Sequence, residues 1–178
     1  EFGSDSMPQT ADNLAADYAL TRDACDAFAA SSQHRFEAAR SGGFFEGELT
    51  PIEIAGRKGA VTMVAEDEHP RPDTTLEKMA SLRPLGPTGV VTAANASGIN
   101  DGAAALLIGR NDLGSAPRGR ILAGAVSGVA PRVMGIGPAL AIPKAFSRAG
   151  LTLEQMDVIE INEAFASQVL ACCKALDL

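Results

Sequence analysis

The most informative segment of the sequence is Asp157-Val-Ile-Glu-Ile-Asn-Glu-Ala-Phe-Ala-Ser-Gln168, near the end of the chain. Its apolar run, residues 158–161, predicts a buried strand, and the alanine-rich residues after it predict a helix that continues to Leu176. The uncharged Asn162 would then lie between the strand and the helix, where α/β sheets bind ligands. The stretch therefore predicts an α/β fold in which Asn162 either binds a ligand or caps the helix.

The rest of the chain predicts alternating helices and strands. Helices are expected at residues 10–18, 22–41, 75–82 and 138–149, the second capped by Thr21 and ended by Gly42 and Gly43. Strands are expected at residues 49–54, 60–64 and 121–129 and at the Val90-Val91 segment. The polar residues 110–119 read as a linker.

Composition limits the classes of partner. The 178 residues are 46% hydrophobic, which is ample for a core, and the formal net charge of -7 argues against nucleic acid or an anionic membrane as a partner. Any anion site must therefore be local. No apolar run reaches the roughly 18 residues of a membrane span and no signal peptide is visible, so we expect a cytoplasmic protein.

The three cysteines do not indicate a disulfide framework or a zinc site. Cys25, Cys172 and Cys173 are odd in number and lack the CxxC spacing of metal sites, so no metal is expected. Cys25 falls on the apolar stripe of its helix, which favours a packed core residue over a reactive thiol.

Arg71 is the clearest candidate for a local anion site. Prolines 70 and 72 restrict the backbone on both sides of it and so restrict the direction of its guanidinium group, which suits phosphate binding. An ion pair with nearby carboxylates is the alternative. His69 could act as a base or simply face solvent.

The segment from Val90 to Gly102 ends in small polar residues and glycines, which let a ligand approach the backbone closely. Ser97 lacks both a neighbouring base and the GxSxG elbow of a serine nucleophile, so a tight loop is the better interpretation. The Gly135-Ile-Gly137 sequence lacks the third glycine of a dinucleotide fingerprint.

Four segments together resemble the thiolases, the acyl-CoA C-acyltransferases. They are Ser6-Met-Pro-Gln-Thr-Ala-Asp12, Thr92-Ala-Ala-Asn-Ala-Ser-Gly-Ile-Asn-Asp-Gly102, Met134-Gly-Ile-Gly-Pro138 and Asn162-Glu-Ala-Phe-Ala166, in the order found in that family. The sequence around His69 and Arg71 looks most like that of degradative thiolases, particularly the 3-oxoadipyl-CoA thiolases.

The resemblance implies a thiolase fold of two similar βαβαβαββ halves with a loop domain inserted in the first. Residues 1–98 would be the loop domain that binds CoA, residues 99–114 the last strand of the first half, and residues 115–178 the start of the second half. The chain would be an internal fragment of a longer enzyme.

The implied activity is thiolytic cleavage of a 3-oxoacyl-CoA, such as 3-oxoadipyl-CoA, to acetyl-CoA and a shortened acyl-CoA. Coenzyme A would be a substrate, no cofactor would be needed, and the full enzyme would be a homodimer or homotetramer. The nucleophilic Cys and the later His and Cys of the family match no residue here, so the chain alone is expected to be inactive.

The resemblance also implies roles for individual residues. Asn162 matches a catalytic residue that holds a water and helps to form an oxyanion hole. Arg71 matches an arginine near the CoA adenine and phosphates. The other positions that match CoA-contacting residues are Met7, Ala93, Ser97, Ala164 and Phe165.

Two further hypotheses remain beside the enzymatic one. The chain could be a non-catalytic module that binds CoA or regulates a partner, or a structural remnant in which the same polar residues merely close turns.

Overall fold

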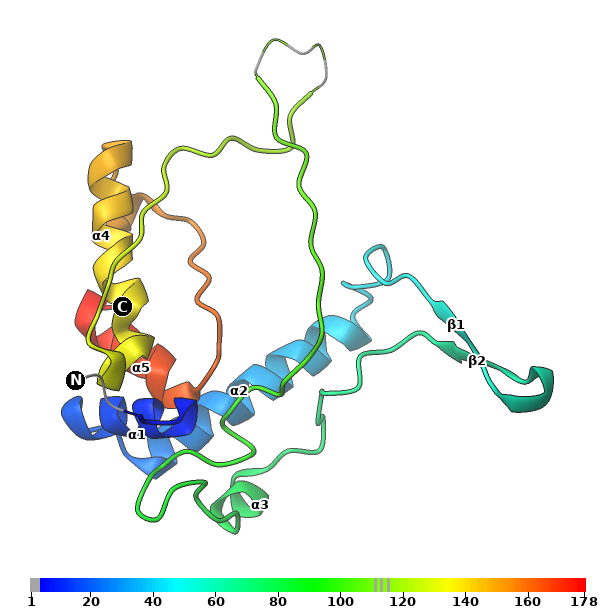
Figure 1. Cartoon of the computed structure of the whole chain (residues 1–178), viewed down its shortest axis with the longest axis horizontal. Helices are drawn as coiled ribbons and strands as arrows, with labels where there is room; N and C mark the ends of the chain where they lie inside the picture. The colour runs from blue at the N-terminus through cyan, green and yellow to red at the C-terminus, as the bar shows by residue number, and fades with distance from the viewer. Residues whose placement is uncertain (1–3, 111, 113, 115) are drawn as a thin grey trace.

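The computed structural model describes residues 4–110, 112, 114 and 116–178. The α-helices in those residues are α1 (Met7–Asp17), α2 (Arg22–Ser41), α3 (Leu76–Ala80), α4 (Gly137–Ala149) and α5 (Ala166–Leu176). The strands are β1 (Ile52–Ala55) and β2 (Val61–Val64), and the short 3-10 turns are η1 (Arg57–Gly59), η2 (Pro131–Ile136) and η3 (Leu153–Gln155). Helices α1, α4 and α5 gather at one end, and α2 leads from them toward a projecting hairpin (Figure 1).

Local signals account for the helix boundaries. The Thr21 side chain accepts a hydrogen bond from the N–H of Ala24 at 3.1 Å and so caps α2, and Gly42 follows its last turn. Thr75 caps α3 in the same way, and Gly150 takes the left-handed conformation that ends α4. The helices predicted from capping residues and periodicity are confirmed, although α1 begins three residues earlier than expected.

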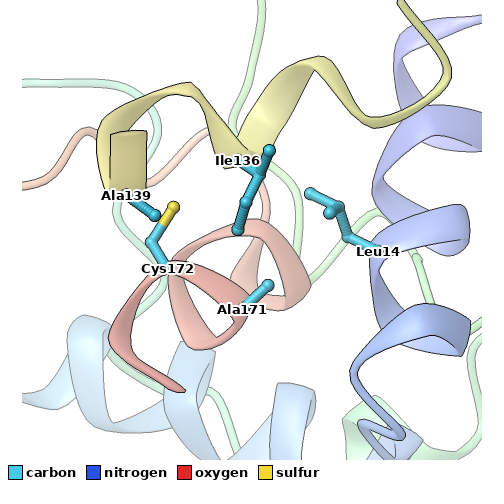
Figure 2. Packing of buried hydrophobic residues seen from close by; sticks show 5 residues of the cluster. All are labelled: Leu14, Ile136, Ala139, Ala171 and Cys172. Atoms are coloured by element: carbon cyan, nitrogen blue, oxygen red, sulfur yellow. The ribbon is translucent and has the colours of Figure 1, made fainter. Parts of the chain in front are cut away.

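The core lies where α1, η2, α4 and α5 meet. Its buried residues are Leu14, Ile136, Ala139, Ala171 and Cys172. Figure 2 shows them converging from these four elements. Because Ala139 and Ala171 are small, the backbones of α4 and α5 can approach closely. The Cys172 thiol also donates a hydrogen bond to the carbonyl oxygen of Gly135 at 3.3 Å, which ties α5 to η2.

The two strands form an antiparallel hairpin that projects from the helices (Figure 1). Ile52 pairs with Val64 and Ala55 with Val61, so the predicted hairpin is confirmed. Its tight turn holds Lys58 at a φ of 59°, in the left-handed region that non-glycine residues rarely adopt.

The strands predicted at residues 90–91, 121–129 and 158–161 are wrong, whereas the strand implied within 99–114 stays a prediction because residues 111 and 113 lie outside the described residues. Residues 90–91, 99–110, 121–129 and 158–161 form no paired strand, and Val158 is 76% exposed and Leu107 104% exposed. A strand needs a neighbouring strand to pair its backbone N–H and C=O groups, and the described residues place no paired strand beside these runs. The predicted linker at 110–119 falls partly on residues 111, 113 and 115, which lie outside the described residues.

The start of α5 also differs from the prediction. The helix begins at Ala166 with Phe165 in the capping position, so Asn162 is not its N-cap. Asn162 instead lies in an irregular segment where its carbonyl oxygen accepts the N–H of Ala164 at 3.0 Å. This leaves the side-chain amide of Asn162 available for a ligand.

Candidate functional site

An isolated antiparallel bridge between Ala96 and Phe165 organises the candidate site. On one side of it the N–H of Ser97 donates to the carbonyl oxygen of Ala164, and on the other the N–H of Ala166 donates to that of Asn95, both at 2.9 Å. The bridge holds the loop at residues 90–100 against the segment before α5. Two polar segments that are far apart in the sequence are thereby aligned.

A buried side-chain network fixes the shape of the loop. The Asn95 amide donates to Asp26 on α2 at 2.8 Å and to the carbonyl oxygen of Val90 at 2.9 Å, and its oxygen accepts the N–H of Thr92 at 2.8 Å. Asp26 in turn accepts a hydrogen bond from Arg22 at 2.7 Å. Every polar atom of the Asn95 side chain therefore has a partner, which makes the loop rigid.

Asp12 on α1 holds the beginning of the same loop. One of its carboxylate oxygens accepts the backbone N–H groups of Val90 and Val91, at 2.8 and 3.0 Å. Its other oxygen would lie 1.9 Å from a Cβ at position 89, so only glycine fits there. A carboxylate that satisfies two backbone donors stabilises a turn that has no regular ladder of its own.

The first cavity, of about 570 Å³, opens on the α2 side of the bridge. Arg71, Ala93 and Ser97 all line it, so the structure brings three of the predicted residues together. His69 and Glu163 also line this cavity, and Glu163 accepts a hydrogen bond from the Ser32 hydroxyl at 2.6 Å.

Arg71 does not form the surface ion pair considered from the sequence. Its Nη1 atom donates to the carbonyl oxygens of Glu68, His69 and Pro70, at 2.7, 2.9 and 2.9 Å. These bonds curl the side chain over its own loop and hold the guanidinium group in place. Nε and Nη2 make no hydrogen bond with the residues that the structure describes, so they can still bind a ligand.

The second cavity, of about 200 Å³, lies between α1, η2 and α5. The predicted residues Met7, Asn162, Ala164 and Phe165 line it, together with apolar neighbours that include Met134. The side-chain oxygen of the neighbouring Gln168 is buried and has no hydrogen-bond partner in the described part of the chain. This small cavity offers an amide and mostly apolar walls.

The predicted residues thus fall into two adjacent cavities. Segment 162–166 separates them, because Glu163 and Ala166 line the first and Asn162 and Phe165 line the second. The sequence indicated neither this division nor the contacts that Asp12 and Asp26 make with the loop. The signal available for these two acids was an acidic residue beside an apolar one within a predicted helix, Asp12 after Ala11 and Asp26 after Cys25.

None of the three cysteines is suited to act as a nucleophile. Burial raises the pKa of Cys25 to about 11, with a further contribution from the negative charges of Asp26 and Asp12. Burial also raises the pKa of Cys172, whereas Cys173 is only half-buried but lines neither cavity. Since the thiolate is the reactive form, Cys25 and Cys172 are held in the unreactive state.

The described residues contain no group of three or more His, Cys, Asp or Glu side chains placed to hold a metal ion. Within the same parts of the chain no helix has the length and apolar character needed to cross a membrane.

Comparison with known proteins identifies the family. Residues 2–112 match the model of the thiolase N-terminal domain, and residues 115–178 match that of the thiolase C-terminal domain. The chain belongs to the thiolase family. It is 54% identical over 181 residues to the beta-ketoadipyl-CoA thiolase of Pseudomonas aeruginosa, covering 99% of this chain and 45% of that protein. The chain therefore spans less than half the length of this thiolase.

Solved thiolase structures confirm that the chain has a partial thiolase fold. The Bacillus anthracis acetyl-CoA acetyltransferase superposes with a TM-score of 0.92 at 44% identity, covering 97% of this chain and 45% of that one. Human mitochondrial 3-ketoacyl-CoA thiolase in complex with CoA superposes with a TM-score of 0.88 at 45% identity, over 97% of this chain and 43% of that one. The resemblance to thiolases drawn from four sequence segments is confirmed.

Proposed function

We propose that this chain is the CoA-binding part of a thiolase that transfers an acyl group between CoA thioesters. The observation that carries the proposal is the pair of cavities on either side of the Ala96–Phe165 bridge, one lined by the guanidinium group of Arg71 and one small and mostly apolar. An acyl-CoA has the matching parts, a charged nucleotide end and a small thioester end. The beta-ketoadipyl-CoA thiolase relative favours a 3-oxoacyl-CoA such as 3-oxoadipyl-CoA as the substrate.

The first cavity would hold the nucleotide and the pantetheine arm. The free Nε and Nη2 donors of Arg71 suit a phosphate, because a guanidinium group can donate two parallel hydrogen bonds to its oxygens. Ser97 offers a hydroxyl to an amide of the arm, and Ala93 leaves room for the arm to lie close to the backbone.

The second cavity would hold the thioester. The Asn162 amide carries no charge at any physiological pH, so it can donate to a developing oxyanion directly or through a water. One such donor is worth roughly 3 kcal/mol of transition-state stabilisation. Met7, Ala164 and Phe165 would enclose the acyl group and exclude bulk water.

The nucleophile would come from outside these 178 residues. Cleavage of a 3-oxoacyl-CoA through an acyl-enzyme needs a thiolate, and Cys25 and Cys172 are buried with raised pKa values. We therefore expect the isolated chain to bind CoA without turning over an acyl-CoA.

Calorimetric titration of the isolated chain with CoA tests the binding part of this proposal. We expect saturable binding that Arg71→Ala weakens about tenfold, since a hydrogen bond to a charged group contributes about 1.5–3 kcal/mol. Arg57→Ala at the tip of the hairpin removes the same charge far from the cavity and should leave binding unchanged. Equal losses for both variants, or no binding, would contradict the proposal.

Asn162 is best tested in a longer thiolase chain that contains these residues. Asn162→Ala should lower kcat for 3-oxoadipyl-CoA about a hundredfold with a small change in KM, because the amide acts mainly in the transition state. An unchanged kcat would remove Asn162 from the mechanism.

A non-catalytic CoA-binding module is the second candidate function. The burial of Cys25 and Cys172, with Cys173 away from both cavities, favours it. Co-expression with the remaining segments of a thiolase discriminates the two, because restored cleavage supports the enzyme and CoA binding without cleavage supports the module.

A further inference from the structure

The His69 ring packs directly against Gly98 on the wall of the first cavity. A Cβ atom at position 98 would lie 2.0 Å from Cε1 of His69, 2.5 Å from Nδ1 and 2.9 Å from Nε2. These distances are far shorter than van der Waals contact, so the ring occupies the space that any side chain at position 98 would need. The absence of a side chain at Gly98 therefore sets where the ring lies.

The nitrogens of the His69 ring are available to a ligand. The ring makes no hydrogen bond with the described residues, whereas the other histidine, His34, is engaged with the carbonyl oxygen of Thr74 at 3.0 Å. Arg71 lines the same cavity with its own Nε and Nη2 unengaged. Two nitrogen-donor side chains, both fixed by local packing or hydrogen bonds, thus share one wall.

The charges around His69 differ on its two sides. On the side of the first cavity lie Arg71 and Glu163, and the Glu163 carboxylate is engaged with Ser32. On its other side His69 lines an open cavity of about 790 Å³ that contains the carboxylates of Glu66, Asp67, Glu68 and Asp101. Because His69 lines both cavities, its ring offers a hydrogen-bond donor to an anion bound beside Arg71.

We propose that His69 is a second phosphate-binding side chain of this site, with Gly98 as its positioning residue. The proposal rests on CoA binding in the first cavity and specifies how the nucleotide end is recognised. One ring nitrogen carries a hydrogen and donates it to a phosphate oxygen that Arg71 also binds. Pantetheine has no phosphate, so His69 would not contribute to its binding affinity.

Calorimetric titration of the isolated chain with CoA, dephospho-CoA and pantetheine tests this inference. We expect His69→Ala to weaken CoA binding about tenfold, as loss of a charge-assisted hydrogen bond does, and to leave pantetheine binding unchanged. His69→Gln, which keeps an N–H donor, should recover part of the loss. If His69→Ala weakens the binding of dephospho-CoA as much as that of CoA, His69 contacts the diphosphate. If it weakens the binding of CoA alone, His69 contacts the 3′-phosphate.

A double-mutant cycle tests the link to Gly98. Gly98→Ala should weaken CoA binding about as much as His69→Ala, and the double variant should lose no more than either single variant. Gly102→Ala is the matched control, because a Cβ there meets nothing within 4 Å. Additive losses would show that Gly98 does not act through His69 and would overturn its positioning role.

The outcomes separate this inference from the proposed function. If Arg71→Ala weakens CoA binding and His69→Ala does not, His69 is not a ligand and CoA binding still stands. If His69→Ala weakens the binding of pantetheine and CoA equally, the ring stabilises the fold and does not bind the phosphate, and the inference is overturned. If the unaltered chain binds no CoA, both proposals fail. Should Gly98→Ala unfold, the His69→Gln and pantetheine comparisons still decide the role of His69.

Discussion

At the scale of single residues, the absence of a side chain decides where two functional groups lie. Gly98 leaves space for the His69 ring, and Gly89 leaves space for the Asp12 carboxylate that holds the 90–91 backbone. In both cases the close neighbour is a polar group whose position matters to the cavity. These glycines serve close approach rather than an unusual backbone conformation.

Gly89→Ala should destabilise the chain by about 2 kcal/mol, because the new methyl group would force Asp12 away from the N–H groups of Val90 and Val91. Urea unfolding followed by circular dichroism measures the loss. Gly102→Ala, with open space around its Cβ, should change the free energy of unfolding by less than about 0.5 kcal/mol. Equal stability of the two variants would show that Asp12 can move without cost.

The cysteines should differ in their rate of alkylation by iodoacetamide at pH 8. Burial holds the pKa of Cys25 at about 11 and raises that of Cys172, so both remain protonated and shielded at this pH. The half-buried Cys173 should therefore be labelled first, as peptide mass spectrometry would show. The reaction of Cys25 should speed up as the pH rises toward 11. In urea the three sites should react alike, and early labelling of Cys25 without urea would contradict its burial.

At the scale of elements, α2 connects the parts of the site. Its Asp26 holds the 90–97 loop through Asn95, its Ser32 hydroxyl holds Glu163, and Gln33 accepts the backbone N–H of Arg71 at 2.8 Å. One face of a single helix thus contacts three segments that line the first cavity. The same helix also lines that cavity with Phe28 and Ala29.

Thr21→Ala should lower the free energy of unfolding by about 1 kcal/mol, since it removes the side-chain acceptor for the N–H of Ala24. Thr21→Ser keeps the hydroxyl and should restore most of the loss. Chemical denaturation of the three proteins under one set of conditions makes the comparison. If Thr21→Ser were as unstable as Thr21→Ala, the methyl group of Thr21 rather than its capping hydroxyl would contribute to the free energy of unfolding.

The elements that could be predicted are those with local causes. Thr21, Gly42 and the apolar spacing between them specify α2 without reference to the rest of the chain, and the Gly56–Gly59 turn specifies the hairpin. The run at 158–161 has the composition of a buried strand, but its pairing depends on a neighbour that the described residues do not supply. Asn162, Arg71 and Ser97 could be identified as ligand-binding candidates. Their separation into two cavities could not, because it depends on the tertiary contact between Ala96 and Phe165.

At the scale of the whole molecule, the packed helices contrast with long extended runs. Large apolar side chains are exposed along them, including Ile99, Leu107, Val126 and Val158. Figure 1 shows the run at 99–110 passing away from the helical core, whereas the run at 121–129 lies along α4, whose Lys144 and Arg148 donate hydrogen bonds to it. Extended apolar chain without a partner neither buries area nor satisfies its backbone, so it contributes little to stability.

Hydrogen exchange should report this division directly. Amides at residues 103–108 and 121–129 should exchange close to the rate of an unfolded peptide, whereas those of α5, which packs against α1 and α2, should be protected. Mass spectrometry after deuterium labelling at neutral pH gives both rates in one sample. If the amides of residues 103–108 were as protected as those of α5, their N–H groups would be hydrogen-bonded and the prediction would be wrong.

The Ala96–Phe165 bridge has an evolutionary consequence. Its hydrogen bonds join main-chain atoms only, so the alignment of the two segments does not depend on their side chains. Substitutions at the flanking positions 93, 97 and 164 can therefore diversify ligand preference while the frame between the two cavities persists. A lineage of such proteins can therefore change its ligand preference one side chain at a time, without refolding the scaffold that presents those side chains.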